Sequence, residues 1–221
     1  MINQLIFVLH SSIISGLVIF FGRMGSAALT SYISLLFVLT NIFVIKQMDL
    51  CGYHVTCADA YIIGISFGIN VLQEIWGQKA ARQAISISFL CSLFYVIMGL
   101  FHLWYIPAGH DTSHAHFVYL LDNSVRIIVA SFISYLVVQY ADTILYAFMK
   151  KRLDGRHFIL RNYLSMFSSQ FFDTILFSFL GLYGIVHNMT HIVIVSYGIK
   201  VVAILLSTPF LYYAKKYIKK S

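Results

Sequence analysis

Seven stretches of about 20 continuously apolar residues follow one another along the chain, and a helix needs this length to cross a bilayer. In lipid, only a helix or a closed barrel satisfies every backbone N–H and C=O group. Barrel strands are shorter and alternate between apolar and polar residues. We therefore predict an all-α, polytopic transmembrane bundle of about seven helices. The stretches cover residues 2–21, 27–48, 58–76, 84–106, 117–149, 161–184 and 191–214.

The composition excludes a water-soluble domain. Hydrophobic residues make up 60% of the chain and charged residues 10%, whereas about a quarter of a soluble domain is charged. The first stretch has no basic segment before it and no small-residue cleavage site, so we predict a retained helix rather than a signal peptide. No linker or low-complexity segment divides the sequence. We expect residues 1–221 to form a single membrane domain, with the first turns of the fifth stretch in the interface.

Lys and Arg residues are distributed unevenly between the connecting loops. Of the 15 basic residues, 12 follow the first, third, fifth or seventh stretch. Because cytoplasmic loops carry the excess of Lys and Arg, this pattern predicts a cytoplasmic C-terminus and an external N-terminus. The net charge of +7 is then a topology signal and does not require a nucleic-acid partner. These 12 residues are Arg23, Lys79, Arg82, Lys150, Lys151, Arg152, Arg156, Arg161, Lys215, Lys216, Lys219 and Lys220.

A few charged residues lie within or at the edges of the apolar stretches. A lone charge at the bilayer centre costs about 2.5–3.5 kcal/mol even on the lenient insertion scale. We therefore expect the deepest of them to face the bundle interior, a cavity or one another. The basic members are Lys46, Arg126 and Lys200, and the acidic members are Asp59, Glu74, Asp142 and Asp173.

Asp173 and Lys200 are predicted to lie at the same depth. Each is about nine or ten residues from the outer end of its helix, which corresponds to ~15 Å at the helical rise. The two helices are consecutive and antiparallel, so the opposite charges indicate an ion pair or two walls of one site. A purely structural pair is the alternative.

Uncharged polar residues accompany these charges at helical spacing. Asn70, Gln73 and Glu74 share one helix face, and Gln139 shares another with Asp142. Gln170, Asp173 and Phe177 share a third, while Asn41 lies midway along the second stretch. Amides in membrane helices often only hold helices together. Their combination with carboxylates and aromatic rings also fits a cavity for a guanine-like base.

The remaining reactive side chains leave several alternatives open. Cys51 and Cys57 lie in or beside an outside loop and are compatible with a disulfide or with two free thiols. The histidines and the aspartate in or beside the loop after the fourth stretch are compatible with a divalent metal site or with an ordinary exposed loop. No phosphate-binding loop, zinc-protease motif or nucleophile elbow is present, so we expect neither an enzyme nor a cofactor. These loop residues are His102, His110, Asp111, His114 and His116.

The ordered set of motifs resembles the queuosine precursor transporters, also called the vitamin uptake transporter group. Residues 70–82 read Asn-Val-Leu-Gln-Glu-Ile-Trp-Gly-Gln-Lys-Ala-Ala-Arg, similar to an acidic-x-aromatic-Gly and Ala-Arg signature of that family. Residues 168–174 look like its Ser-x-x-x-Asp-Thr element. Asn70 is a departure, because family members often carry Asp there. Further matches are Asn41, Lys46, Arg126, Ser131, Gln139, Asp142, Lys200 and Pro209, so the resemblance covers about residues 41–209.

The resemblance implies import of a deazaguanine base for salvage into tRNA queuosine, namely 7-cyano-7-deazaguanine, 7-aminomethyl-7-deazaguanine or queuine. We expect Glu74, Asp173 and Asn41 to contact the base edge. A homodimer, an energising ATPase subunit and a metal carrier that uses the loop histidines remain alternatives. The predicted substrate-binding residues are Asn41, Asn70, Gln73, Glu74, Gln170, Asp173 and Phe177. The residues predicted to form gating pairs or to take part in a proton-linked step are Lys46, Arg126, Asp142 and Lys200.

Overall fold

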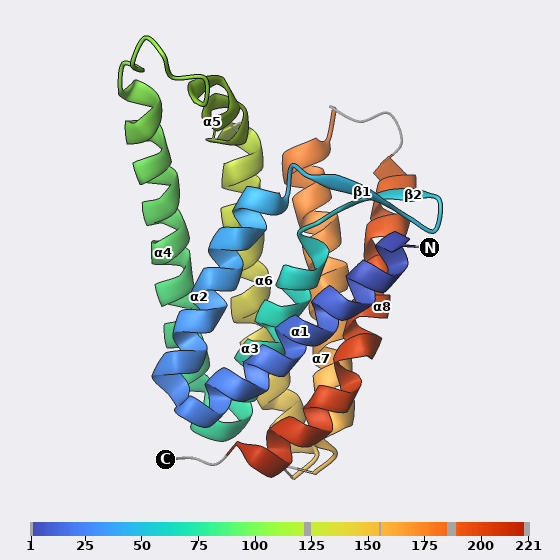
Figure 1. Cartoon of the computed structure of the whole chain (residues 1–221). Coiled ribbons are helices and arrows are strands. Elements are labelled where there is room, and N and C mark those ends of the chain that lie inside the picture. The colour runs from blue at the N-terminus through green and yellow to red at the C-terminus, as the bar shows by residue number, and fades with distance from the viewer. Residues whose placement is uncertain (1, 122–124, 155, 185–188, 219–221) are drawn as a thin grey trace.

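The protein is a bundle of long helices with a small β-hairpin at one end (Figure 1). The computed structural model describes residues 2–121, 125–154, 156–184 and 189–218. In Figure 1, α1 begins near the hairpin and α8 ends at the opposite end of the bundle. The elements are α1 (Ile2–Met24), α2 (Ser26–Phe43), β1 (Gln47–Leu50), β2 (Tyr53–Thr56), α3 (Asp59–Trp76), α4 (Gln78–Trp104), α5 (His114–Leu121), α6 (Val125–Arg152), α7 (Phe158–Phe177), a π-helical turn η1 (Ser178–Leu182) and α8 (Met189–Tyr217).

Five of the described helices are long and apolar enough to cross a membrane: α1, α2, α4, α6 and α8. The other two long helices, α3 and α7, are not among these five, and both carry acidic and amide side chains. The predicted helical bundle is therefore confirmed, whereas the count of apolar spans among the described residues is five rather than seven.

Helix α3 lies at the centre of the bundle. It packs against α1, α2, α4, α6, α7 and α8, and 13 of its 18 residues are buried. Gly64 permits close contact with α1, because a Cβ there would lie 2.3 Å from Ile14 Cγ2. A helix that carries Asp, Glu and amide side chains can occupy this position because neighbouring helices separate those side chains from lipid.

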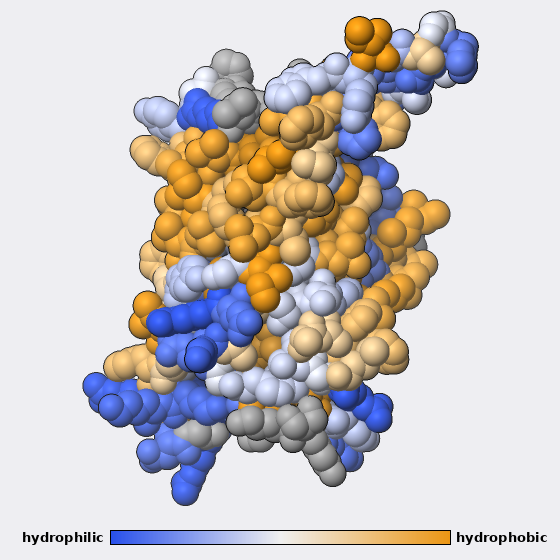
Figure 2. All heavy atoms as spheres, turned by 90° about the vertical axis from the view of Figure 1, so that its left-hand side faces the viewer, coloured by the Kyte–Doolittle hydropathy of each residue, from blue (hydrophilic) through white to orange (hydrophobic). Residues whose placement is uncertain are grey.

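The outer surface of the bundle is apolar. On α4, the side chains of Leu90, Phe94, Ile97 and Phe101 are all exposed and recur at helical spacing. Figure 2 shows a broad, mostly hydrophobic band across one face, with hydrophilic atoms gathered at its lower end. In water such a patch would drive association, whereas in a bilayer it faces lipid tails.

The hairpin β1–β2 was not predicted from the sequence. Its antiparallel register pairs Gln47 with Thr56 and Leu50 with Tyr53. Cys51 and Gly52 form the two-residue turn with φ angles of 53° and 84°, as a tight hairpin of this type requires. Because α2 ends at Phe43, Lys46 is exposed in the connection that precedes the hairpin, although the predicted helical stretch continued to residue 48. Cys51 and Cys57 are free thiols.

Several predicted boundaries were wrong in ways that affect charged residues. The fifth stretch forms two helices, α5 and α6, and residues 122–124 between them lie outside the described residues. Helices α4, α6 and α7 extend into the predicted loops. Lys79, Arg82, Lys150 and Arg161 are therefore helical rather than loop residues. Lys219 and Lys220 lie outside the described residues.

Candidate functional site

Buried polar side chains meet where α3, α6 and α7 pack together. Helices α3 and α6 run away from the hairpin end, and α7 runs back toward it (Figure 1). The Nε2 atoms of Gln139 and Gln170 both donate hydrogen bonds to Ser66 Oγ, at 3.1 and 2.8 Å. Asn70 Nδ2 donates to Asn162 Oδ1 at 3.2 Å. We call these five buried residues the amide cluster: Ser66, Asn70, Gln139, Asn162 and Gln170.

Several polar atoms of the amide cluster form no hydrogen bond, and most of these atoms are acceptors. Within the described part of the chain, Asn70 Oδ1, Gln139 Oε1 and Gln170 Oε1 are buried without a hydrogen-bond partner. Among the cluster's amide nitrogens, Asn162 Nδ2 is likewise buried and has no hydrogen-bond partner in the described residues. A buried polar group without a partner is costly. The cluster is therefore suited to a ligand that presents several N–H donors.

Two further polar residues adjoin this cluster. Gln73 Nε2 donates to the Thr143 carbonyl at 2.7 Å, and Gln73 Oε1 has no partner among the described residues. Asp142 is buried and accepts a hydrogen bond from Ser165 Oγ. No salt bridge within the described residues involves Asp142.

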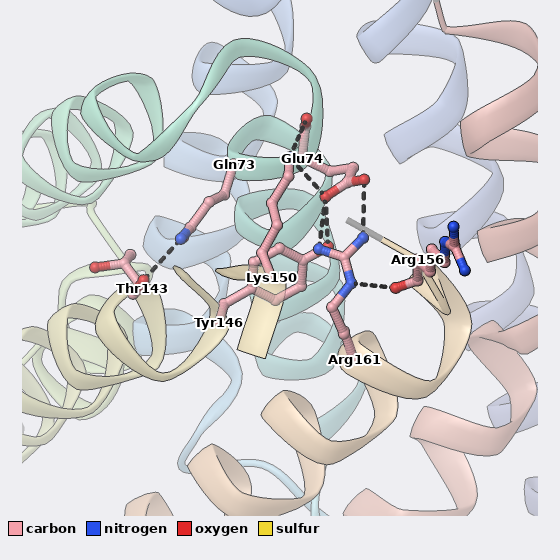
Figure 3. A network of polar contacts seen from close by, with 7 residues as sticks. All are labelled: Gln73, Glu74, Thr143, Tyr146, Lys150, Arg156 and Arg161. Atoms are coloured by element: carbon pink, nitrogen blue, oxygen red, sulfur yellow. Dashed lines mark hydrogen bonds and ion pairs between the residues drawn. The ribbon is translucent and has the colours of Figure 1, made fainter. Parts of the chain in front are cut away.

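A charged network closes the end of the bundle remote from the hairpin, and we call it the latch (Figure 3). Arg161 donates to Glu74 through both terminal nitrogens, at 3.2 Å to Oε2 and 3.0 Å to Oε1. Lys150 Nζ lies 3.0 Å from Glu74 Oε2, and the Tyr146 hydroxyl donates to the same oxygen at 3.1 Å. The four residues join the ends of α3, α6 and α7 that are remote from the hairpin: Glu74, Tyr146, Lys150 and Arg161.

Arg161 differs most from the prediction made for it. It was counted as a loop charge, yet its side chain is 0% exposed and pairs with Glu74. The guanidinium is also held by the Arg156 carbonyl, which accepts from Nε at 3.0 Å, and lies 5.4 Å from the Tyr146 ring centroid. The apolar run Phe158-Ile159-Leu160 immediately before Arg161 was a signal that the helix had already begun.

The ion pair predicted between Asp173 and Lys200 is confirmed. Lys200 Nζ lies 2.7 Å from Asp173 Oδ2, and both side chains are largely buried. Asp59, at the start of α3, interacts electrostatically with both groups. This cluster links α3, α7 and α8 in the half of the bundle nearer the hairpin. The predicted contacts of Asp173 and Glu74 with substrate stay predictions, and in this structure cations hold both carboxylates.

The other predicted residues lie apart from the amide cluster. Asn41 donates to Ser92 Oγ at 2.7 Å and accepts from Ser131 Oγ at 3.2 Å, beside a hollow between α2, α4 and α6. Arg126 donates to the carbonyls of Leu180 and Tyr183 at 2.8 and 2.7 Å. These bonds satisfy carbonyl groups at the end of η1, since the last carbonyls of a helix generally lack an intrahelical donor. Phe177 ends α7 and is half-buried. Among the described residues, neither Lys46 nor Arg126 forms an ion pair, so their gating roles stay predictions.

The sequence left a metal site open at the histidines of residues 102–116. The described residues contain no group of three His, Cys, Asp or Glu side chains that could hold a metal ion. Asp111 accepts hydrogen bonds from Ser113 Oγ and Ser113 N at 2.6 and 2.7 Å. These donors hold the pKa of Asp111 below its ordinary value. The carboxylate is thus engaged in a local turn.

Sequence polarity pointed to only part of the amide cluster. Asn70, Gln139 and Gln170 were identified by their helical spacing, but Ser66 and Asn162 were missed, as was Ser165, which donates to the adjoining Asp142. Ser66 precedes Asn70 by four residues, and Asn162 precedes Ser165 by three. This spacing was a detectable signal, because residues three or four apart share a helix face.

Known proteins resemble this chain over most of its length. The profile of a family described as putative vitamin uptake transporter matches residues 60–214. A protein of Bacillus subtilis (strain 168) named probable queuosine precursor transporter is 30% identical over 204 residues, which cover 90% of this chain and 86% of the relative. No solved structure matches. With five apolar helices, the chain is a multi-pass membrane protein, as expected for the cell inner membrane.

Proposed function

Because the chain belongs to the putative vitamin uptake transporter family, we propose that it imports a queuosine precursor for salvage into tRNA queuosine. The substrate is a 7-deazaguanine base: 7-cyano-7-deazaguanine, 7-aminomethyl-7-deazaguanine or queuine. The name of the Bacillus subtilis relative supports this choice of cargo. The structural observation that carries the proposal is the amide cluster, with its buried and unused acceptor atoms.

The hydrogen-bonding chemistry of the cluster complements such a base. A deazaguanine presents N–H donors at its ring and amino nitrogens and an acceptor at its carbonyl oxygen. The unpartnered carbonyl oxygens of Asn70, Gln139 and Gln170 would accept from those donors, and Asn162 Nδ2 would donate to the carbonyl. A site built to bond such groups strongly discriminates against analogues that lack them.

Alternating access at this site would depend on separating α3, α6 and α7. The latch joins the ends of these helices remote from the hairpin and is suited to be the inner gate. The Asp173–Lys200 pair joins α7 to α8 in the other half of the bundle and is suited to control the outer side. In this mechanism one network opens while the other stays closed, so the base is never exposed to both sides at once.

The proposed topology has seven crossings, with the hairpin outside and the C-terminus in the cytoplasm. Helices α3 and α7, which are not among the five helices long and apolar enough to cross a membrane by themselves, supply the other two crossings. Both run along the bundle beside the five apolar helices (Figure 1), and their polar residues are covered by protein. The basic residues between α6 and α7 then lie inside, in accord with the positive-inside rule. We propose that residues 1–221 act as one membrane domain without enzymatic activity.

Uptake in a bacterial strain that can neither make nor import queuosine precursors tests this function. The chain is expressed there alone, each precursor is supplied separately, and queuosine in tRNA is measured. Recovery with one precursor identifies the cargo and shows that the chain needs no partner beyond what the host supplies. No recovery with any precursor, despite confirmed membrane insertion, contradicts a stand-alone transporter and favours an ATPase-driven importer or another cargo.

The amide cluster is tested in the same strain with Gln170→Leu. Because this change removes a buried hydrogen-bonding group, we expect uptake at limiting substrate to fall about tenfold or more, which corresponds to ~1.4 kcal/mol or more. Gln83→Leu is the matched control, since Gln83 is exposed on α4. Equal uptake by the two variants, at equal amounts in the membrane, would contradict a role of the cluster in binding.

A further inference from the structure

Asp142 is a buried helical acid that forms no ion pair with any residue the structure describes. Its side chain is 2% exposed, and it lies one helical turn beyond Gln139 on α6. Oδ1 accepts a hydrogen bond from Ser165 Oγ, while Oδ2 is buried without a partner among the described residues. The carboxyl group therefore lies beside the amide cluster, with one oxygen unused.

The other described acids within helices have cationic neighbours. Glu74 pairs with Arg161 and Lys150, and Asp173 pairs with Lys200. Asp59 interacts with the same Lys200. Buried carboxylates are normally paired or become neutral, because an isolated charge in a low-dielectric interior is very costly. Asp142 has no such partner in the described residues and is therefore suited to be neutral when buried.

In the described part of the elements packed on α6, no cation pairs with Asp142. Tyr146 interacts with it from the next turn of α6, while Glu74 of α3 and Arg161 of α7 bond to each other in the latch. Helix α4 presents the hydroxyls of Ser86 and Ser88 to tyrosines of α6, and its Lys79 and Arg82 are exposed. η1, the remaining element packed on α6, has no ionisable residue.

We propose that Asp142 binds the proton whose inward movement drives accumulation of the substrate. Oδ2 takes up a proton when the site opens to the outside, and the neutral side chain crosses the occluded state. The proton leaves when the site opens to the cytoplasm and water solvates the carboxylate. This inference rests on the proposed import function, but it concerns the energy source rather than the cargo.

Purified protein in proteoliposomes separates these two questions. Counterflow, the exchange of external labelled base for base loaded inside, measures binding and alternating access without net proton movement. Accumulation under an inward proton gradient, with a pH dye in the lumen, measures coupling. One pH unit supports about tenfold accumulation at one proton per substrate. We expect wild-type protein to show counterflow, accumulation and luminal acidification that depends on substrate.

Asp142→Asn is expected to retain counterflow but to lose both accumulation and acidification. Asp154→Asn removes an exposed acid between α6 and α7 and is expected to behave as wild type. Wild-type counterflow without substrate-dependent acidification would overturn the proposal, as would accumulation that follows a sodium gradient instead. Absence of counterflow with every deazaguanine would instead contradict the proposed import function.

Ser165→Ala provides a second test that does not depend on whether Asp142→Asn folds. The Ser165 hydroxyl donates to the carboxylate and favours its ionised form. Its removal is expected to shift the pH dependence of accumulation to higher pH, while Ser86→Ala, at a partly exposed site on α4, leaves it unchanged. An unchanged pH profile in Ser165→Ala would overturn the assignment of the proton to Asp142.

Discussion

Arg161 shows how one buried cation can be accommodated at the end of a membrane bundle. Its guanidinium is always charged and has five N–H donors in a planar fork. Glu74 accepts two of those bonds and the Arg156 carbonyl accepts another. Lys150 and Tyr146 bind the same carboxylate. The side chains therefore compensate one another, and loss of one partner leaves the others buried without their charge balance.

Glu74→Gln removes the negative charge from this network. Breaking a buried pair from one side destabilises a protein by about 3–5 kcal/mol, so we expect a clearly lower midpoint of thermal unfolding in detergent. The double variant Glu74→Gln with Arg161→Met should recover part of the loss, because it also removes the uncompensated guanidinium. Asp154→Asn is the exposed control. An unfolding midpoint for Glu74→Gln equal to that of this control would contradict the structural role of the latch.

The contrast between Arg161 and Lys200 explains which charges could be placed from the sequence. Lys200 lies far from any loop, so its depth and its pairing with Asp173 followed from helix geometry. Arg161 is the fourth residue of α7, and a shift of one helical turn in the predicted start of that helix would move it between a solvated loop and the protein interior. The number of basic residues in each loop does not determine where the helix begins to within one turn. The partners of Asn70 and Gln139 also depended on how helices rotate against each other, which periodicity does not determine.

The connection between α3 and α4 consists of Gly77 alone. Its φ and ψ angles are 92° and 170°, a region that is essentially restricted to glycine. This conformation reverses the chain within one residue and places Gln73 and Gln78 so that both side chains donate to the Thr143 carbonyl. The glycine in the family-like motif at residues 70–82 thus has a backbone function that is separate from substrate.

Gly77→Ala is expected to destabilise the bundle by about 1–3 kcal/mol, because alanine must adopt the strained conformation. No atom outside the turn lies within 4 Å of the added methyl group, so the effect reports backbone strain rather than a clash. Gly198→Ala is the matched control, since Gly198 is helical in α8 and also has open space around it. Thermal unfolding in detergent measures both, and equal midpoints would exclude strain at Gly77.

At the level of elements, apolar length predicted the helices well and the connections poorly. The resemblance of residues 70–82 and 168–174 to a transporter family is confirmed by the family match. The hairpin was missed because Met48 and Leu50 extend the apolar pattern beyond the end of α2. The division between α5 and α6 was missed because both sides of residues 122–124 are apolar. Hydropathy alone cannot distinguish a continuing helix from a change of direction.

Over the whole molecule, polar groups are arranged by depth between α3, α6, α7 and α8. The Asp173–Lys200 pair lies toward the hairpin end, the amide cluster and Asp142 lie between, and the latch lies at the other end. Apolar helices surround this interior. A path that can be closed at either end is what alternating access requires, and it accounts for the acidic and amide side chains of α3 and α7.

The proposed orientation makes the two ends of the bundle chemically distinguishable. Cys51 is exposed in the hairpin turn, and Arg156 is exposed between α6 and α7 at the opposite end (Figure 1). With Cys57→Ser and Cys91→Ser in place, a membrane-impermeant maleimide should label Cys51 in spheroplasts. With Cys51→Ser added, the introduced thiol of Arg156→Cys should be labelled only after the membrane is permeabilised.

Labelling must be measured at both Cys51 and the introduced thiol of Arg156→Cys, because a thiol that reacts with no reagent is uninformative about its side of the membrane. Permeabilised membranes give the maximum labelling for each variant and serve as its own control. Labelling of Arg156→Cys from outside, with Cys51 protected until permeabilisation, would reverse the orientation. The latch would then be the outer gate, since it shares its end of the bundle with Arg156 and binds the Arg156 carbonyl. Labelling as expected would make the latch the barrier that must open for the base to reach the cytoplasm.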